Sequence, residues 1–261
     1  MFETQKEPLG LGVFMGKTER KVTTGKFPGL SGDMLKWIAM ITMFIDHVGM
    51  TSLNPYGPHY AFLYTLMRGI GRLAFPLFCF LLVEGFNHTT NYRRYVIRMA
   101  VFALISEIPF NLVLAGSVWY PAYQSVMVTL LIGLLGLGAY RWCVNHQYPI
   151  YGIMVVVSAV LCGWLTSCDY GAEGVLLIFL FYLLQHEPIW RAVSLAIWCV
   201  MMGGLEIYGA FAVLPIALYN GTRGKCGKWF QWFGYVFYPG HLLLILLLNK
   251  VAGVLAGIFL S

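Results

Sequence analysis

Long apolar runs separated by short polar loops make up most of the chain after residue 33. The first run, Met34–Leu53, has twenty residues. An α-helix of that length rises about 30 Å, enough to cross the hydrocarbon core of a bilayer. The pattern therefore predicts an all-α bundle of membrane-spanning helices. The next runs are 60–86, 95–115, 124–142, 150–167 and 170–185.

Residues 189–219 fit two interpretations, either one long tilted span or two short spans broken at Gly203–Gly204. Basic residues gather on the cytoplasmic side of membrane proteins. Two short spans place Arg223, Lys225 and Lys228 on that side with the other basic loops, whereas a single span places them outside. We therefore expect two spans, although each is shorter than the roughly twenty residues of an ordinary crossing.

The last run begins near Trp229 and contains YPGH (Tyr238–His241). Its end is open, because residues 251–260 either continue the helix or form a partial one. With this run the pattern predicts a polytopic integral membrane bundle of about nine or ten transmembrane helices.

The distribution of Lys and Arg also predicts the orientation of the bundle. If every run crosses once, a cytoplasmic N-terminus puts nearly all basic residues at inside ends. The acidic loop around Asp169 and Glu173 then lies outside. The loops predicted inside are 87–94, 141–149 and 221–228.

Composition supports a single membrane domain. The chain has 261 residues and is 59% hydrophobic but only 11% charged, whereas a soluble domain has about 25% charged residues. Residues 1–33 are expected to form a polar, mobile cytoplasmic tail, and residues 34–261 one transmembrane domain. The net charge of +6 is explained by the basic inside loops. The expected partner is therefore a lipid bilayer, and no nucleic acid is expected to bind. The six cysteines have no metal-ligand spacing, so no metal is expected.

Several ionisable side chains fall inside the predicted spans, where an unpaired charge is costly. Arg68 and Arg72 are four residues apart and share a helix face, so they require anions beside them. Asp46 and Glu107 are the candidates within the protein, and a structural Asp46–Arg72 ion pair is the simplest case. Ligand phosphates are the functional alternative, because arginine binds their oxygens in pairs. The full set is Asp46, His47, Arg68, Arg72, Glu84, Glu107 and His241.

His47 is the candidate general base. Neighbours on a helix point about 100° apart, so we assign Asp46 to the arginines and His47 to a cavity. A neutral imidazole is well suited to take a proton from an amine or a hydroxyl near pH 7. His241 follows Pro239 and Gly240, and it either binds substrate, assists proton transfer, or hydrogen-bonds a carbonyl freed by a kink. A packing role without chemistry is the alternative for both histidines.

Several segments resemble one family of membrane proteins, in the same order along the chain. They are LKWIAMITMFIDHVG (Leu35–Gly49), GRLAFPLFCFLLVEGFNHT (Gly71–Thr89), FALISEIPFN (Phe102–Asn111), DYGAEGV (Asp169–Val175), LYNGTRG (Leu218–Gly224) and FYPGHLLLI (Phe237–Ile245). Together these segments resemble the TraX family, membrane proteins named for pilin N-acetylation in conjugation. The resemblance covers roughly residues 34–248.

This resemblance implies acetyl transfer from acetyl-CoA and a relation to the transmembrane acyltransferases. In that group an intramembrane histidine acts while CoA enters from the cytoplasmic side. By position, the resemblance implies that the family's Asp-His pair falls on Asp46 and His47, its GR on Gly71–Arg72, and its YPxH on Tyr238 and His241. We therefore expect catalytic roles for His47, Asp46 and His241. The expected substrate-binding residues are Arg68, Arg72, Glu107 and Tyr238.

The expected function is that of an acetyltransferase in the bacterial inner membrane, with cytosolic acetyl-CoA as donor. The acceptor is an amine or a hydroxyl, such as a pilin N-terminus, an envelope sugar or a small amine. One alternative is a proton-coupled secondary transporter of an anionic substrate, in which Asp46, His47 and Glu107 relay protons. The other is a non-catalytic membrane assembly protein, in which the polar residues only hold helices together.

Overall fold

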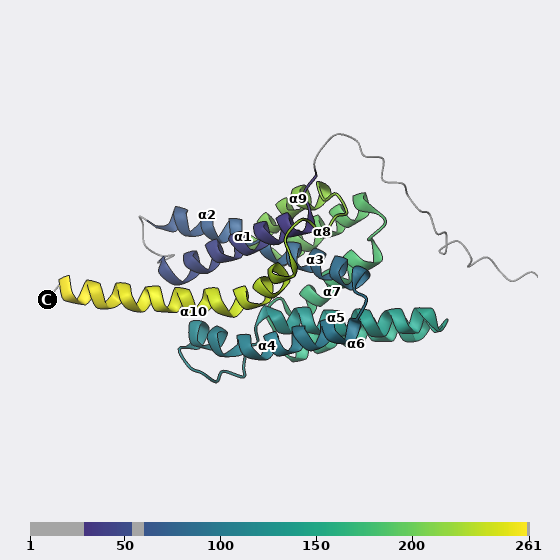
Figure 1. Cartoon of the computed structure of the whole chain (residues 1–261), viewed down its shortest axis with the longest axis horizontal. Helices are drawn as coiled ribbons and strands as arrows, with labels where there is room; N and C mark the ends of the chain where they lie inside the picture. The colour runs from purple at the N-terminus through teal and green to yellow at the C-terminus, as the bar shows by residue number, and fades with distance from the viewer. Residues whose placement is uncertain (1–28, 54–59, 260–261) are drawn as a thin grey trace, which may run out of the picture.

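The structure is built from helices, as the apolar pattern predicts (Figure 1). This computed structural model describes residues 29–53 and 60–259, so most of the predicted tail 1–33 lies outside the described residues. These ranges contain no strand, only two isolated β-bridges. The elements are α1 (Gly32–Ser52), α2 (Ala61–Gly71), α3 (Ala74–His88), α4 (Tyr92–Ala115), α5 (Val126–Asn145), α6 (Pro149–Leu165), α7 (Gly171–Leu183), α8 (Pro188–Met202), η2 (Gly204–Ala212), α9 (Val213–Ala217) and α10 (Lys228–Phe259).

Four helical stretches are long and apolar enough to cross a bilayer, which makes the chain a polytopic membrane protein. They are 61–88 (α2 with α3), 92–115 (α4), 126–145 (α5) and 229–252 (α10). The other apolar helices are shorter: α6, α7 and α8 have 17, 13 and 15 residues. At 1.5 Å per residue these helices span about 20–26 Å. The estimate of nine or ten spans therefore counted several helices that are shorter than an ordinary crossing.

Two interruptions in the helices matter for the site. The predicted run 60–86 is two helices that meet at Arg72 and Leu73, and both of these residues keep right-handed helical angles. Residues 188–217 are divided at Gly203 and Gly204, whose φ values are +70° and +53°. Glycine has no Cβ and adopts such angles freely. The predicted break at Gly203–Gly204 is confirmed.

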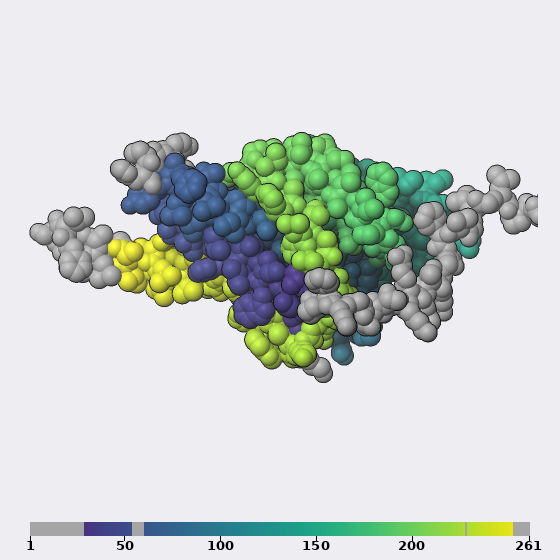
Figure 2. Space-filling model, turned by 90° about the horizontal axis from the view of Figure 1, so that it is seen from above, coloured from purple at the N-terminus to yellow at the C-terminus, as the bar shows by residue number. Residues whose placement is uncertain are grey.

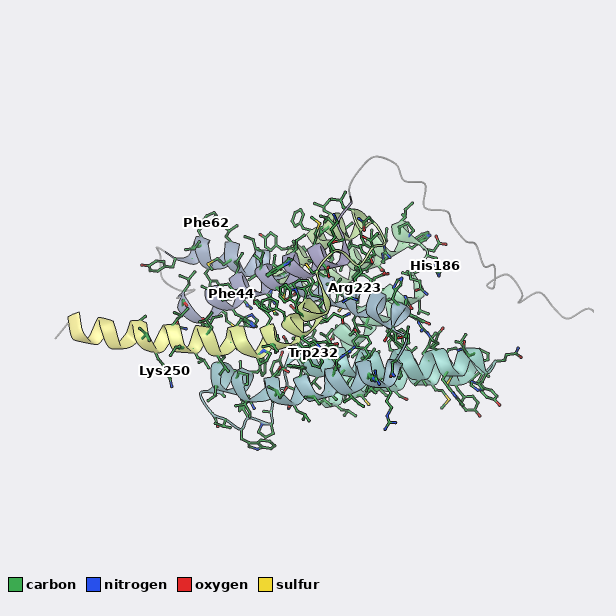
Figure 3. The ribbon with its side chains drawn as sticks, viewed as in Figure 1. Phe44, Phe62, His186, Arg223, Trp232 and Lys250 are labelled. Carbon is green, nitrogen blue, oxygen red and sulfur yellow. The ribbon has the colours of Figure 1, made fainter. Side chains whose placement is uncertain are left out.

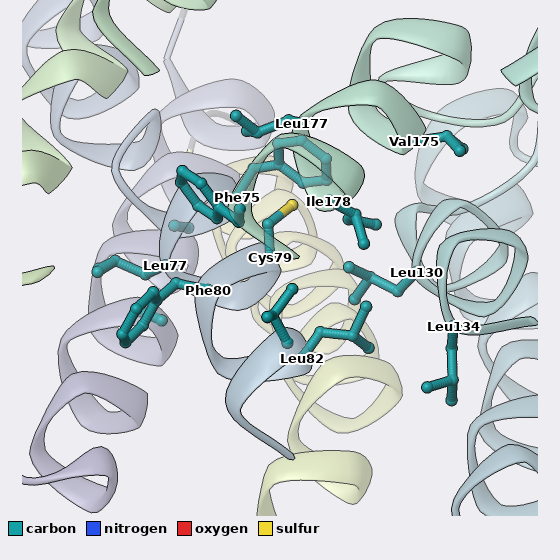
Figure 4. Close-up of a cluster of buried hydrophobic side chains, with 14 of the residues drawn as sticks. Phe75, Leu77, Cys79, Phe80, Leu82, Leu130, Leu134, Val175, Leu177 and Ile178 are labelled. Carbon is teal, nitrogen blue, oxygen red and sulfur yellow. The ribbon is translucent and has the colours of Figure 1, made fainter. Parts of the chain in front are cut away.

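Helix α3 lies at the centre of the bundle and packs against α1, α5 and α7. Its buried side chains include Leu77, Cys79 and Phe80, which belong to the same buried cluster as Leu134 of α5 and Ile178 of α7 (Figure 4). A helix that is apolar on all sides is expected at the centre of a bundle.

Glycines on α5 let its neighbours approach closely. A Cβ at Gly133 would collide with Ile178 of α7, and one at Gly136 would lie 2.9 Å from the ring of Phe179. Small residues at such contacts are a common feature of helix packing in membranes.

The start of α1 is anchored to the segment before α10. Ser31 caps α1 by accepting a hydrogen bond from the Met34 amide at 3.4 Å. The amides of Gly32 and Asp33 donate to the carbonyls of Thr222 and Arg223, each at 2.8 Å. In Figures 1 and 2, α10 then runs along the long axis of the molecule beside α1. This pairing of α1 and α10 positions the candidate site.

Candidate functional site

Asp46 is buried about two-thirds of the way along α1 and is paired with both arginines. Arg68 Nη1 donates to Asp46 Oδ2 at 2.5 Å, and Arg72 Nη2 donates to Asp46 Oδ1 at 2.6 Å. Side chains four apart on a helix share one face, which is why α2 presents both guanidiniums to one carboxylate. The predicted pairing of Asp46 with the arginines is confirmed.

A second carboxylate, which sequence reasoning missed, completes this cluster. Arg72 Nη1 donates to Glu206 Oε1 at 2.5 Å and to the Tyr170 hydroxyl at 3.1 Å. Glu206 is an acid within an apolar stretch, and that signal was available in the sequence. Two carboxylates now balance two guanidiniums, so Asp46, Glu206, Arg68 and Arg72 form a formally neutral cluster, as burial of charge requires.

Gly71 makes the close approach of α1 and α2 possible. A Cβ placed on Gly71 would overlap the side chain of Asp46. Any other residue would therefore push α1 away and break the ion pairs of Asp46. This gives a physical reason for a glycine directly before Arg72.

His47 and His241 face each other across the contact between α1 and α10. The distance from His241 Nε2 to His47 Nδ1 is 3.4 Å, and the rings meet edge to face with centroids 4.9 Å apart. His241 is buried, and its ring also stacks on Phe237 at 4.9 Å. The two histidines that sequence reasoning placed in separate spans therefore form one pair.

Backbone carbonyls decide how protons are placed on this pair. His47 Nδ1 lies 2.9 Å from the Met43 carbonyl, and His241 Nδ1 lies 2.8 Å from the Phe237 carbonyl. A carbonyl only accepts hydrogen bonds, so both Nδ1 atoms carry hydrogen in the neutral rings. The single Nδ1–H of His47 is then shared between the Met43 carbonyl and, at the longer distance, His241 Nε2, both of which accept. The basic lone pair of His47 is on Nε2, which has no hydrogen-bond partner among the described residues.

A cavity of about 510 Å³ lies among α1, α3, α4, α5 and α10, within the size range of ligand sites. Three segments predicted inside meet at one of its ends, which is lined by Asp33, Lys36, His88 and Arg223. At the other end it reaches Met43, Val126 and Tyr238. His47, which was predicted to face a cavity, does not line this one, and neither does His241. Met43 and Tyr238, which do line it, lie about one helical turn before the two histidines.

The cavity contains only one of the predicted substrate-binding residues. Tyr238 lines it, whereas Arg68, Arg72 and Glu107 do not. Glu107 instead accepts a hydrogen bond from the Ser125 amide at 3.0 Å through Oε1. Lys36, Arg98 and Arg223 do line the cavity, and none of the three was among the predicted site residues.

A clasp between two loops lies next to the ion cluster. The Tyr123 hydroxyl donates to Asp169 Oδ1 at 3.0 Å, and the Asp169 amide donates to the Gln124 carbonyl at 2.9 Å. Burial raises the pKa of the Asp169 carboxyl above its usual value, and the hydrogen bond from Tyr123 opposes that rise. The clasp holds Tyr170, the next residue, in position against Arg72.

In the part of the chain that the structure describes, no group of three or more His, Cys, Asp or Glu side chains is arranged to hold a metal ion. The fold and the site define a class: a helical membrane protein with a buried neutral ion cluster beside a pair of histidines.

This chain belongs to the TraX protein family, which matches residues 31–249. It is 29% identical over 240 residues to the probable fimbrial assembly protein FimC, serogroup H1, of Dichelobacter nodosus, covering 82% of this chain and 94% of that protein. It is 26% identical over 161 residues to an uncharacterized protein of Rickettsia prowazekii (strain Madrid E), covering 59% of this chain and 56% of that protein. No solved structure matches.

Proposed function

We propose that this protein is an integral membrane acetyltransferase in which Nε2 of His47 is the general base. The observation that carries the proposal is the histidine pair. Its backbone contacts leave one basic nitrogen, Nε2 of His47, without a partner among the described residues. A positioned base of this kind suits proton removal from an attacking amine or hydroxyl.

In the proposed reaction, the acceptor nitrogen or oxygen attacks the carbonyl carbon of acetyl-CoA while Nε2 of His47 takes its proton. A carbon–nitrogen or carbon–oxygen bond forms, and a tetrahedral intermediate results. The carbon–sulfur bond then breaks, and the protonated His47 returns the proton to the leaving thiolate. The products are the acetylated acceptor and CoA, with no change in oxidation state.

His241 orients the base in this scheme. Its Nε2 accepts a hydrogen bond from the Nδ1–H of His47 at 3.4 Å, which favours the tautomer with a free Nε2 lone pair and stabilises the imidazolium that forms. Asp46 acts through its ion pairs, which hold α1 against α2 and thereby position His47. The geometry favours this structural role for Arg68 and Arg72 over the predicted contact with a ligand.

The proposed orientation places the N-terminus in the cytoplasm and the protein in the bacterial inner membrane. The start of α1, the segment before α10 and the end of α3 meet at one end of the cavity. All three were assigned to the inside by their basic residues, so their meeting supports donor entry from the cytosol.

The acceptor we propose is a pilin N-terminus, and an envelope sugar and a small amine are the alternatives. The relative from Dichelobacter nodosus is named a probable fimbrial assembly protein, which favours a pilus subunit. The same name also favours a non-catalytic assembly protein as the second candidate function.

Labelled acetyl-CoA separates these functions. Membranes with and without the protein receive acetyl-CoA carrying a labelled acetyl group, and mass spectrometry searches for labelled products. We expect a labelled product that depends on the protein. A transporter or a non-catalytic assembly protein gives no such product, so its absence with verified pilin present would contradict the proposal.

A further inference from the structure

We propose that the cavity is the binding site of the acyl donor, with the phosphates of CoA at Lys36, Arg98 and Arg223. This inference rests on the proposed function and gives it a donor site. CoA is suited to the cavity because it joins a phosphorylated nucleotide to a slender arm that ends in the reactive sulfur.

The cations at this end of the cavity lack carboxylate partners within the described part of the chain. No carboxylate oxygen among the described residues lies within 4.0 Å of the charged nitrogens of Lys36, Arg98 or Arg223. The Arg98 Nε atom is buried and has no hydrogen-bond partner in the same part of the chain. Lys36 instead lies over the Phe230 ring, 5.1 Å from its centroid. Lys36 and Arg98 are partly buried, and partly buried cations without carboxylate partners favour an anionic ligand.

The two acids nearby are already engaged. Asp33 accepts a hydrogen bond from the Cys226 amide at 2.8 Å. Glu84 accepts one from the Tyr219 hydroxyl at 3.2 Å and lies 3.7 Å from His88. Three cations therefore face two acids that have other partners. The ion cluster of Arg68 and Arg72 differs, because its own carboxylates neutralise it.

The shape of the cavity fits a ligand with a charged head and a narrow arm. Along α1 the cavity extends from Asp33 to Met43, a rise of about 15 Å. The charged residues lie mainly near its cytoplasmic end in the proposed orientation, and the deeper wall is apolar. That wall includes Phe78, Leu82, Met99, Met127 and Leu130. The deep end of the cavity, at Met43 and Tyr238, is one helical turn from the histidine pair. In the proposed reaction the thioester of acetyl-CoA has to reach these histidines.

An anionic phospholipid has the same chemistry of a phosphate head and an apolar arm, so the test distinguishes the two sources. The full-length protein is placed in nanodiscs of zwitterionic lipid, and its affinity for CoA is measured by titration calorimetry. The variants are Arg98→Gln and Arg223→Gln. Arg93→Gln is the matched control, because Arg93 is an exposed arginine near Arg98 on α4 that does not line the cavity.

Arg98→Gln and Arg223→Gln are each expected to weaken the binding of CoA about tenfold or more, because each removes a charge-assisted contact to phosphate. Arg93→Gln is expected to keep the wild-type affinity. Arg223 is exposed and lies outside the helices, so its variant keeps the test valid if Arg98→Gln fails to fold.

Three results would overturn the inference, and they point to different errors. If wild-type protein binds CoA and both cavity variants bind it equally well, the donor site is elsewhere but the acetyltransferase proposal stands. If the variants keep CoA affinity but lose phosphatidylglycerol retained in native mass spectra, the cavity is a lipid site. If wild-type protein binds neither CoA nor acetyl-CoA, the proposed function fails as well.

Discussion

At the scale of single residues, Asp46 and His47 are adjacent in sequence but contact different partners. Asp46 is held by two arginines, and His47 is held by His241 and a carbonyl. Neighbours on a helix point about 100° apart, so Asp46 meets the arginines at α2 while His47 meets His241 of α10.

The role of Arg72 is tested by a double-mutant cycle. Removing one partner of a buried ion pair costs about 3–5 kcal/mol, so Arg72→Gln is expected to lower the thermal unfolding midpoint strongly. Glu206→Gln in the same chain is expected to recover part of the loss, because it removes the carboxylate that Arg72→Gln leaves unpaired, whereas Asp46 keeps its pair with Arg68. If Arg72→Gln folds normally and instead loses CoA affinity, Arg72 contacts the donor as first predicted.

The acetyl-transfer rate is expected to fall as the pH decreases. A protonated imidazole accepts no proton, so kcat/KM should decrease about tenfold per pH unit below the pKa of the base. The measurement is a pH profile of acetyl transfer, with CoA affinity followed at each pH as a control. A rate that is flat or rises toward acidic pH would exclude a histidine base.

Part of this site could be predicted from the sequence. Two arginines four residues apart in an apolar span require anions, and Asp46 was the obvious one. Glu206 was missed because its segment, 189–219, had no settled fold in the pattern. The contact between His47 and His241 joins residues 194 positions apart, and hydrophobic periodicity carries no information about which helices are neighbours. The cavity was missed for the same reason.

At the scale of helices, the site depends on how closely α1 approaches its two neighbours. Gly71 allows Asp46 to reach the arginines of α2. The sequence predicted the helices themselves, because apolar runs bounded by polar loops are a strong signal. It did not predict the change of helix at Arg72 and Leu73, because both residues keep helical angles and the nearby Gly69 and Gly71 are residues that membrane helices also contain.

Gly71→Ala is expected to destabilise the protein by about 3–5 kcal/mol, because the added methyl group displaces Asp46 from its ion pairs. Gly152→Ala on α6 is the matched control. A Cβ there would lie 3.4 Å from the nearest atom of Tyr140, so the change is expected to be neutral or to stabilise the helix by up to about 1 kcal/mol. Equal unfolding midpoints for both variants in detergent would show that Asp46 tolerates the methyl group.

At the scale of the whole molecule, the helix ends separate into two groups along the long axis. Figure 3 shows His186 near one end of the bundle and Lys250 of α10 toward the other. Arg223 lies between them, nearer the end with His186. The basic residues predict that the end nearer Arg223 is the cytoplasmic one. The short helices α6 to α8 show that length alone does not count the crossings, since several apolar runs are too short for an ordinary span.

The orientation is tested with single cysteines in a chain whose native cysteines are replaced. A cysteine at Lys225, before α10, is expected to react with a membrane-impermeant thiol reagent only after the cells are permeabilised. A cysteine at Trp119, between α4 and α5, is expected to react in intact cells. Both positions are exposed, so access to the reagent decides the result. Labelling of Lys225→Cys in intact cells would contradict two crossings in residues 188–217.

The most direct test of the account is acetyl transfer by His47→Ala and His241→Ala, with donor binding measured in parallel. Removing a positioned base typically slows a reaction about 10²–10⁴-fold. His47→Ala should therefore lose acetyl transfer to that extent while binding acetyl-CoA normally, and His47→Gln should not restore it. His241→Ala should slow the reaction less, because it removes only the orientation of the base. A His47→Ala protein with near wild-type transfer, beside a His241→Ala protein with none, would place the base on α10 and contradict the account.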